Sequence, residues 1–287
     1  MNRRVICILT VLGILMGGIL LIKQNYNKGK SVQVSMIVLN DKSEGFFQTD
    51  VEENTANFTL DILYQANYKV KFQLYLLLNF EVIPYSLNGQ KENLVNELFL
   101  NPSDEIQAST GNTISVRGLS KATNDLCFVL VSDTDTFTKR FQINNVNAVV
   151  ESSYSRIEVS SPKQTFEQSY TVFEDSQNKN VDVIIDLAYV IEGSRYKEKF
   201  LEEDSRFNMA VVVFNEGEST FELIGCAAIE EKQFEFNIST QAVRTGDCIR
   251  ILLFPFANQY NENFISTYKM TLWSSPISID RIRIGEK

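Results

Sequence analysis

The sequence predicts an all-β protein: two tandem antiparallel β-sandwich domains, immunoglobulin-like or jelly-roll-sized, that follow one N-terminal transmembrane helix. Three observations predict this. An apolar segment lies near the N-terminus, short segments with strand periodicity recur along the chain, and the two halves share landmarks in the same order. Residues 1–30 are expected to hold a leader and an anchor, residues 31–160 the first domain and residues 161–287 the second.

The composition favours strands over helices. The chain of 287 residues is 44% hydrophobic, and it contains 20 Phe and 11 Tyr but only 13 Gly and 5 Pro. Aromatic residues are enriched in strands because they pack well on a pleated surface. The apolar content also provides enough buried surface to offset the entropy lost on folding, so a disordered chain is not expected.

The anchor is predicted over Val5–Ile22, an uncharged run of 18 residues that follows Arg3 and Arg4. At about 1.5 Å of rise per residue, such a helix is roughly 27 Å long, which suffices to cross a hydrocarbon core. Leu, Ile and Val each favour insertion at the bilayer centre by about 0.3–0.6 kcal/mol. The chain is therefore expected to contact the membrane through residues 5–22.

The fate of this segment has alternatives. A cleaved secretory signal would have a shorter apolar region and a nearby cleavage site of small residues, and it would leave a secreted protein. A buried core helix is the third interpretation. Lys23, Lys28 and Lys30 balance the arginines on the other side, but so short a leader usually stays in the cytoplasm. We expect an uncleaved, single-pass anchor in the cell membrane, with the body outside the cytoplasm.

The two halves resemble each other at four places, with offsets between 121 and 136 residues. Each match is short, but the common order favours a tandem duplication. The matches are Phe58–Tyr64 with Val183–Tyr189, Leu76–Asn79 with Val212–Asn215, Asn124–Val131 with Gly246–Leu252, and Ser155–Val159 with Asp280–Ile284.

Strand periodicity is clearest at 58–64, where apolar and polar side chains alternate as in a half-buried strand. Turn signals at Asn88-Gly89 and Gly111-Asn112 are expected to separate strands. The other predicted strands are 32–39, 69–83, 114–119, 126–132, 139–146, 155–160, 183–189, 209–215, 220–229, 233–238, 248–254, 267–273 and 277–284. Strands this short, without βαβ alternation, are typical of antiparallel sandwiches.

Two insertions distinguish the halves. Residues 91–100 place Leu94, Val95 and Leu98 on one helical face before Pro102, and residues 195–204 are expected to form a helical turn or two. A short helix that caps the end of a sandwich is the simplest interpretation. The alternative is a partner-binding loop, because recognition tends to lie on loops held by rigid sheets.

Composition excludes several functions. The chain has no histidine, which removes Ser-His-Asp and Cys-His mechanisms and zinc sites with His ligands. Residues 31–287 carry 22 Lys and Arg against 36 Asp and Glu, a charge of −14. Phosphate backbones repel such a body, so no nucleic-acid partner is expected.

Cys226 and Cys248 lie 22 residues apart in the second half. They are a candidate disulfide, which would contribute about 3 kcal/mol and leave Cys127 over. The alternative is that all three cysteines are small buried side chains in apolar strands. No CxxC motif is present, so a zinc ribbon is not expected.

Asp133 and Asp135 form a D-x-D motif after a predicted strand and are candidate Ca²⁺ ligands; the alternative is an exposed acidic turn. Asp61 and Asp186 occupy equivalent positions in the two halves, as do Arg156 and Arg281. These four residues could form ion pairs, or the carboxylates could act in glycoside chemistry. The simplest interpretation is that they are solvated charges on strand faces.

The sequence thus predicts a membrane-anchored extracytoplasmic protein with a non-catalytic role in binding or assembly at the cell envelope. We expect no cofactor, and an envelope or surface protein as partner. One alternative is a surface hydrolase that uses carboxylates or calcium. Another is a structural spacer.

Overall fold

In the computed structural model, the structure describes residues 30–39, 54–119, 123–144, 170–175, 180–186, 207–229, 233–239, 246–255, 276–278 and 281–284. Most of these residues are in β-strands, and no helix forms among them. The predicted all-β class is therefore confirmed. Among the same residues no helix is long and apolar enough to cross a membrane, and the predicted anchor at 5–22 lies outside them.

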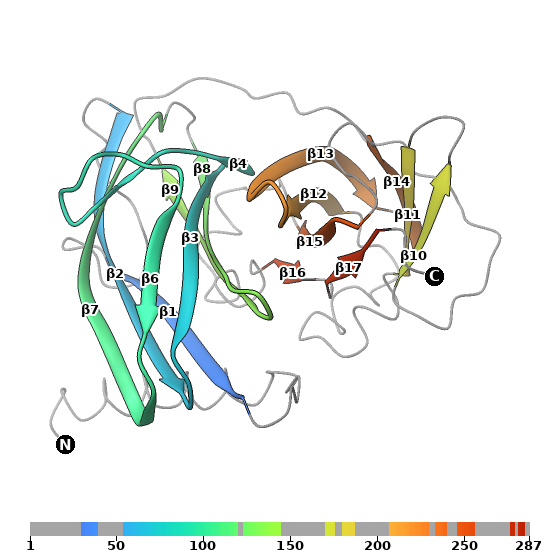
Figure 1. Cartoon of the computed structure of the whole chain (residues 1–287). Helices are drawn as coiled ribbons and strands as arrows, with labels where there is room; N and C mark the ends of the chain where they lie inside the picture. Colours follow the sequence, from blue (N-terminus) through green and yellow to red (C-terminus); the bar gives the residue numbers. More distant parts are fainter. Residues whose placement is uncertain are drawn as a thin grey trace, which may run out of the picture.

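The strands form four antiparallel sheets (Figure 1). Their bounds are β1 (Val32–Leu39), β2 (Thr55–Ala66), β3 (Val70–Leu78), β4 (Glu81–Val82), β5 (Ser86–Leu87), β6 (Asn96–Leu100), β7 (Ser103–Arg117), β8 (Thr123–Val131), β9 (Thr136–Asn144), β10 (Tyr170–Asp175), β11 (Asn180–Asp186), β12 (Phe207–Asn215), β13 (Thr220–Ile229), β14 (Gln233–Ser239), β15 (Cys248–Pro255), β16 (Ile277–Ser278) and β17 (Ile282–Arg283).

We name the sheets in order along the chain. Sheet I has the order β1-β2-β7-β5, and sheet II has the order β4-β3-β8-β9, with β6 also paired to β3. Sheet III has the order β13-β12-β15-β16, with β17 also paired to β15, and sheet IV has the order β10-β11-β14. Sheets I and II use only strands between residues 32 and 144, whereas sheets III and IV use only strands between 170 and 283.

The connectivity of the first two sheets recurs in part in the last two. In each half, two strands form one sheet (β1 and β2, or β10 and β11), and the next strand begins the second sheet (β3 or β12). The chain later returns to the first sheet (β7 or β14) and then to the second (β8 or β15). The first half also crosses between its two sheets at β5 and β6. Asn79 follows β3 and accepts a hydrogen bond from the Asp125 amide, while Asn215 ends β12 and donates to Asp247. The two halves therefore share part of their connectivity, and the tandem duplication stays a prediction.

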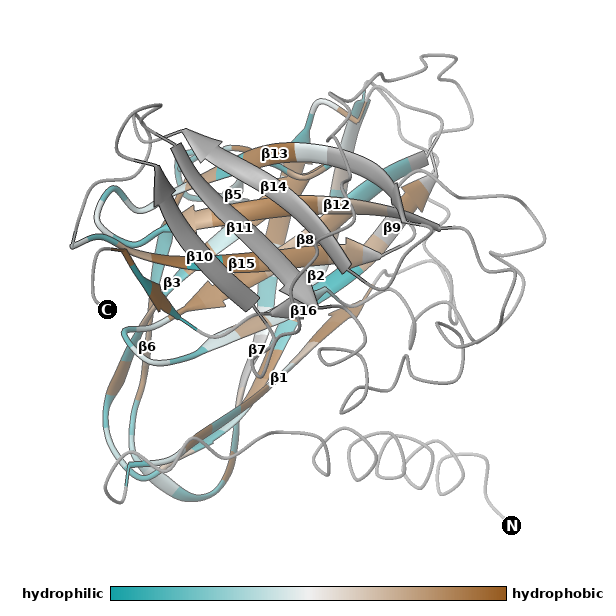
Figure 2. Ribbon diagram, turned by 90° about the vertical axis from the view of Figure 1, so that its right-hand side faces the viewer, coloured by the Kyte–Doolittle hydropathy of each residue, from teal (hydrophilic) through white to brown (hydrophobic). Residues whose placement is uncertain are grey.

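Sheets I and II enclose one apolar core. Alternate residues of β3 and β8 point toward sheet I, since side chains in a strand alternate between its faces. Leu60, Ile62 and Ile114 of sheet I pack in the same cluster as Leu76 and Phe128 of sheet II, and all five are fully buried. In Figure 2, apolar (brown) and polar (teal) stretches both occur along the strands of sheets I and II.

Sheet II is buried on both faces. Leu74, Leu76 and Leu78 of β3 join the core with sheet I, while Tyr75 and Leu77, between them in sequence, belong to a second apolar cluster. That cluster also contains side chains of sheet III, which lies next to sheet II in Figure 1. Strands buried on both faces have near-continuous apolar sequences, as β3 and β8 do.

Most predicted strands match observed ones, and the segments 32–39 and 220–229 coincide with β1 and β13. The predictions at 155–160 and 267–273, like the helical turn at 195–204, lie outside the described residues. The strands β5 and β10, and residues 103–113 of β7, were not anticipated. The helix predicted over 91–100 is wrong, because residues 96–100 form β6 and pair with β3.

The reason for that error is visible in the burial of β6. Asn96 and Leu100 are buried and Leu98 is half-buried, whereas Glu97 and Phe99 are exposed. This is a period of two. Leu94 is 50% exposed and does not contribute to a helical face. Pairing with β3 satisfies the backbone of this segment, so tertiary contact outweighs the helical pattern.

Of the two turn signals, Asn88-Gly89 does form a turn, with positive φ angles of 54° and 72°. The signal at Gly111 instead marks a bulge inside β7, where the pairing with β2 shifts register beside Asp61. Gly111 has a φ of 73°, and its amide donates to Asp61 Oδ1 at 2.7 Å. Asp61 therefore stabilises the bulge, and it is more than a solvated charge.

The bulge leads to a prediction about Asp61. Replacing Asp61 with alanine should lower the free energy of unfolding by about 1–2 kcal/mol, because the Gly111 amide loses a charged acceptor. Asp61→Asn keeps an acceptor oxygen and should lose less. Urea denaturation measures the difference, with Glu105→Ala on the exposed part of β7 as the control, expected within about 0.5 kcal/mol of wild type. Equal losses for Asp61→Ala and Glu105→Ala would refute this role.

Candidate functional site

The most elaborate arrangement of side chains among the described residues lies between sheets II and III. On the sheet II side, β3 and β8 present alternate apolar residues, and on the sheet III side β12 and β15 do the same. The cluster consists of Tyr75, Leu77, Phe80, Cys127, Val129 and Val131 from the first half, and Ala210, Val212, Phe214, Leu252 and Phe254 from the second. Fully burying a Val, Leu or Phe side chain contributes about 1.5–3 kcal/mol, so this contact is strongly stabilising.

Tyr75 is the central aromatic residue of this contact. Its ring lies 5.7 Å from the ring of Phe214 and 4.8 Å from that of Phe221, both edge to face. Its hydroxyl is within hydrogen-bonding distance of the Ser219 carbonyl, at 3.3 Å, and of Gln73 Oε1, at 3.1 Å. Burial raises the pKa of Tyr75 above its usual value, so the hydroxyl is a neutral donor across the interface.

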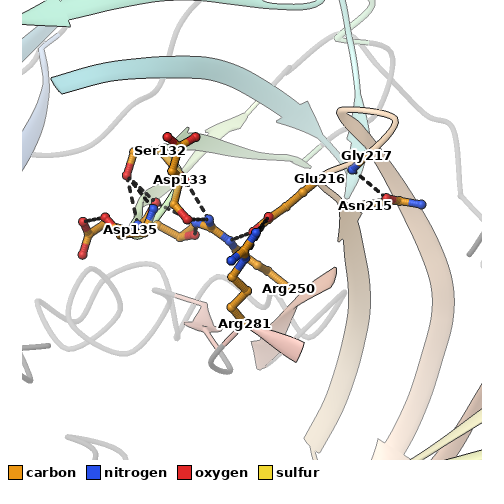
Figure 3. A network of polar contacts seen from close by, with 10 residues as sticks. Ser132, Asp133, Asp135, Asn215, Glu216, Gly217, Arg250 and Arg281 are labelled. Carbon is orange, nitrogen blue, oxygen red and sulfur yellow. Dashed lines mark hydrogen bonds and ion pairs between the residues drawn. The ribbon is translucent and has the colours of Figure 1, made fainter. Parts of the chain in front are cut away.

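Arg250 of β15 is the main polar group of the interface (Figure 3). It lies on the same face of β15 as Leu252 and Phe254, and its side chain is 3% exposed. All its N–H donors are used. The N–H groups of Nη1 and Nη2 donate to the turn between β8 and β9, and the N–H group of Nε donates to Glu216 Oε1 at 2.7 Å.

The turn between β8 and β9 offers a group of backbone carbonyls to this arginine. The Ser132 hydroxyl accepts a hydrogen bond from the Asp135 amide, and the Ser132 amide donates to the Asp135 carbonyl, which closes the turn. Arg250 Nη2 then donates to the carbonyls of Ser132 and Asp133, at 2.6 and 3.0 Å. Arg250 Nη1 donates to the Asp135 carbonyl at 2.7 Å and to Thr136 Oγ1 at 2.6 Å.

Glu216 extends the network toward the surface. Its carboxylate accepts from Arg250 on one side and from Arg281 Nε on the other, the latter at 2.8 Å. Arg281 is 51% exposed, while Glu216 is 16% exposed. The hydrogen bond to Glu216 raises the pKa of Arg281. The partner of Arg281 among the described residues is therefore Glu216. Of the other members of the predicted charge set, Asp61 binds the Gly111 amide, and Asp186 and Arg156 have no described side chains.

A second arginine reaches the interface from the first half. Arg140 of β9 forms a bidentate ion pair with Asp125 of β8, and their side chains are 0% and 4% exposed. The guanidinium lies 5.7 Å from the ring of Phe80 and 5.5 Å from the ring of Phe254. Phe254 belongs to sheet III, so Arg140 contacts the second half as Arg250 contacts the first.

The predicted calcium ligands take part in this network through their backbone. The carbonyls of Asp133 and Asp135 accept hydrogen bonds from Arg250, and Asp135 Oδ2 accepts from Thr134 Oγ1. The Asp133 side chain is exposed. Within the described ranges, no group of three or more Cys, Asp or Glu side chains could hold a metal ion.

The predicted disulfide is not formed in this structure, where Cys248 is a free, half-buried thiol. The register explains this result. Cys226 of β13 faces Ala210 of β12, which in turn faces Phe254 at the far end of β15. Six residues along a strand correspond to about 20 Å, far beyond the Cα separation of about 4.4–6.8 Å that a disulfide needs. Cys127 is buried in the interface, as the alternative interpretation expected.

Thiol labelling tests these assignments. Burial raises the pKa of the Cys127 thiol, so the native protein should not react there with iodoacetamide at pH 8. Cys248 should react in the native protein, and both thiols should react in urea. Peptide mass spectrometry identifies the modified residues. Native modification of Cys127, or a Cys226–Cys248 crosslink in unreduced protein, would contradict the structure.

Sequence reasoning did not identify this network. Arg250 is the only charged residue in β15, a strand that is otherwise apolar apart from Cys248, and that isolation was an available signal. A charge inside an apolar strand needs a buried partner. The identity of the partner was not available, because carbonyls in a turn more than 110 residues away carry no sequence signature.

The sequence matches no protein-family model and no curated protein. Among solved structures, the chain is similar to the YadV chaperone, with 8% identity over 86% of this chain and 99% of that chain, and a TM-score of 0.22. It is also similar to a bacterial adhesin from Mobiluncus mulieris that contains intramolecular disulfide, isopeptide and ester bond cross-links, with 8% identity over 78% and 81% of the two chains and a TM-score of 0.23. At these TM-scores, neither superposition supports a statement about this chain.

Proposed function

We propose that this chain is a single-pass membrane protein whose β-structured body, two tandem β-sandwich domains, lies outside the cytoplasm and acts by binding or assembly at the cell envelope. The observation that carries the proposal is the interface between sheets II and III. An apolar cluster and two reciprocal arginines join the two halves, so that the body presents its surfaces in one fixed arrangement.

Rigidity of this kind suits recognition. Binding costs less when the surfaces that contact a partner are already in place, because less conformational entropy is lost on association. The buried charges support the same role. Arg250 and Arg140 each use their hydrogen-bonding capacity inside the protein, with Glu216 and Asp125 as carboxylate partners. The contacts that cross between the sheets are the hydrogen bonds from Arg250 to the turn between β8 and β9 and the contact of Arg140 with the ring of Phe254.

The position of the body in the cell can be tested on intact cells. Protease added from outside should remove the body and leave the first residues in the membrane fraction. The proposal rests here on the apolar segment 5–22 and the short leader before it. Complete protection of the body from external protease, with digestion only after lysis, would contradict an extracytoplasmic location.

The binding role requires a separate experiment. After mild solubilisation of membranes, the wild-type chain should migrate in a complex larger than the chain itself, on a native gel or by size exclusion. An Arg250→Met variant, which lacks the hydrogen bonds from β15 to the turn between β8 and β9, should lose much of that complex, whereas the surface variant Arg281→Met should retain it. Migration of the wild type as a lone monomer would favour a structural spacer and overturn the binding role.

A further inference from the structure

The end of sheets I and II at which the chain enters the body has a distinctive surface. Val32 of β1 pairs with Ala66 of β2, which also pairs with Ser103 of β7, and Val70 of β3 pairs with Leu100 of β6. The ends of five strands therefore meet there (Figure 1). We call this the proximal end and define it as residues 30–32, 66–71 and 97–106.

The proximal end lies close to the predicted membrane segment along the chain. Val32 follows Ile22 by ten residues. Ten residues reach at most about 33–36 Å even when fully extended. The opposite end of β1, at Leu39, is about another 23 Å along the strand. A chain anchored through residues 5–22 therefore keeps the proximal end within reach of the bilayer surface.

Exposed apolar side chains occur at this end. Phe99 of β6 is 53% exposed, and Ile106 of β7 is 59% exposed. They are the two most exposed of the four large apolar side chains that the described residues leave on the surface; the other two are Leu39 and Leu94. At the interface of a bilayer, aromatic and aliphatic side chains reach the boundary between headgroups and acyl chains.

Lysines surround the aromatic side chains of the proximal end. Lys69 and Lys71 lie over the ring of Phe99, with Nζ at 5.4 and 5.9 Å from its centroid, and Lys30 lies 5.2 Å from the ring of Tyr68. Lysine side chains place their methylene groups along apolar surface and keep the ammonium at the level of the headgroups. The rings of Phe99 and Tyr68, with lysine ammonium groups over them, therefore have the arrangement expected of side chains at the level of lipid headgroups.

The charge of the proximal end also differs from that of the body. Residues 31–287 carry −14, which opposes approach to an anionic surface. At the proximal end, three lysines are matched by three acids, so the local charge is zero. The six residues are Lys30, Lys69, Lys71, Glu97, Asp104 and Glu105. Contact with the bilayer at this end is therefore apolar in origin and should depend little on salt.

We propose that the proximal end rests on the membrane, with the side chains of Phe99 and Ile106 in the headgroup region of the bilayer that holds residues 5–22. This inference rests on the anchored location in the proposed function and adds an orientation to it. The lipid surface is the partner of this face, and the far ends of β1 and β2 point away from the membrane.

Fluorescence quenching by brominated lipids tests the orientation in the full-length chain. The chain contains one tryptophan, so the wild type provides the background signal. The probe is Phe99→Trp, and the matched control is Leu39→Trp, at an exposed apolar position of 46% at the opposite end of β1. Both sites are on the surface, so neither substitution opens a cavity. The variants are reconstituted into phosphatidylcholine vesicles with and without brominated acyl chains.

The added emission of the Phe99→Trp variant should be quenched several-fold more than that of the Leu39→Trp variant, and this difference should persist at 0.5 M salt. Equal quenching of the two probes, whether weak or strong, would overturn the orientation while leaving the anchored location intact. Failure of the wild-type chain to remain with the vesicles on flotation would instead overturn the proposed function itself. An Ile106→Trp probe repeats the test on β7 and should behave like Phe99→Trp.

Discussion

Replacing Arg250 with methionine should lower the free energy of unfolding by about 3–5 kcal/mol, the cost typical of removing one partner from a buried ion pair. The carbonyls of Ser132, Asp133 and Asp135 would lose their donor at the interface. Glu216 would keep only its exposed partner, Arg281. Methionine fills much of the volume, so the loss would reflect the hydrogen bonds more than a cavity.

Two companion variants sharpen this prediction. Arg250→Lys keeps the charge but loses the planar fork that reaches several acceptors together, so it should recover only part of the lost stability. Arg281→Met removes the other arginine on Glu216, and because that side chain is 51% exposed the loss should stay below about 1 kcal/mol. Urea denaturation curves measure all three. Similar losses for Arg250→Met and Arg281→Met would show that the buried network contributes little.

The second large effect is expected at the Asp125–Arg140 pair. Asp125→Asn should lower the free energy of unfolding by about 3 kcal/mol, because the guanidinium of Arg140 is fully buried and would lose its carboxylate. The cost should be smaller for the double variant Asp125→Leu with Arg140→Met. That variant removes both charges and keeps an apolar volume, a change that proteins often tolerate.

The Lys71–Glu97 pair is the matched control, since its side chains are 52% and 50% exposed. Glu97→Gln should change the free energy of unfolding by less than about 1 kcal/mol. Thermal or urea denaturation compares the variants. The interpretation would be wrong if the double variant were less stable than Asp125→Asn. The charge that Asp125→Asn leaves on Arg140 without its carboxylate could not then be the source of the stability lost in that variant.

Much of the strand pattern could be predicted from the sequence, because alternation of apolar and polar residues is a local property. The strand β2 shows it clearly, because buried and less buried residues alternate over 55–63. The helix predicted at 91–100 failed because the same residues also fit a period of two, and only pairing with β3 decides between the patterns. The bulge at Gly111 similarly needed its partner strand, since a glycine and an asparagine also mark a turn.

The sequence also contains a signal for the interface between sheets II and III, which the predicted fold did not take into account. Leu74–Leu78 and Leu126–Val131 are continuously apolar, which is typical of strands buried on both faces. The prediction of two tandem sandwiches did not include a contact between them through the outer face of these strands. The candidate residues Asp133 and Asp135 were in the correct turn, but their backbone carbonyls, and not their carboxylates, make the contacts with Arg250.

The central claim is that the two halves form one cooperative body, and segment-resolved hydrogen exchange in increasing urea tests it most directly. The amides of β8 in the first half and of β12 in the second should become exchangeable through one common opening, with the same free energy and the same dependence on urea. If β12 and β15 instead exchanged at low urea while β3 and β8 remained protected, the halves would be independent and the account would be contradicted.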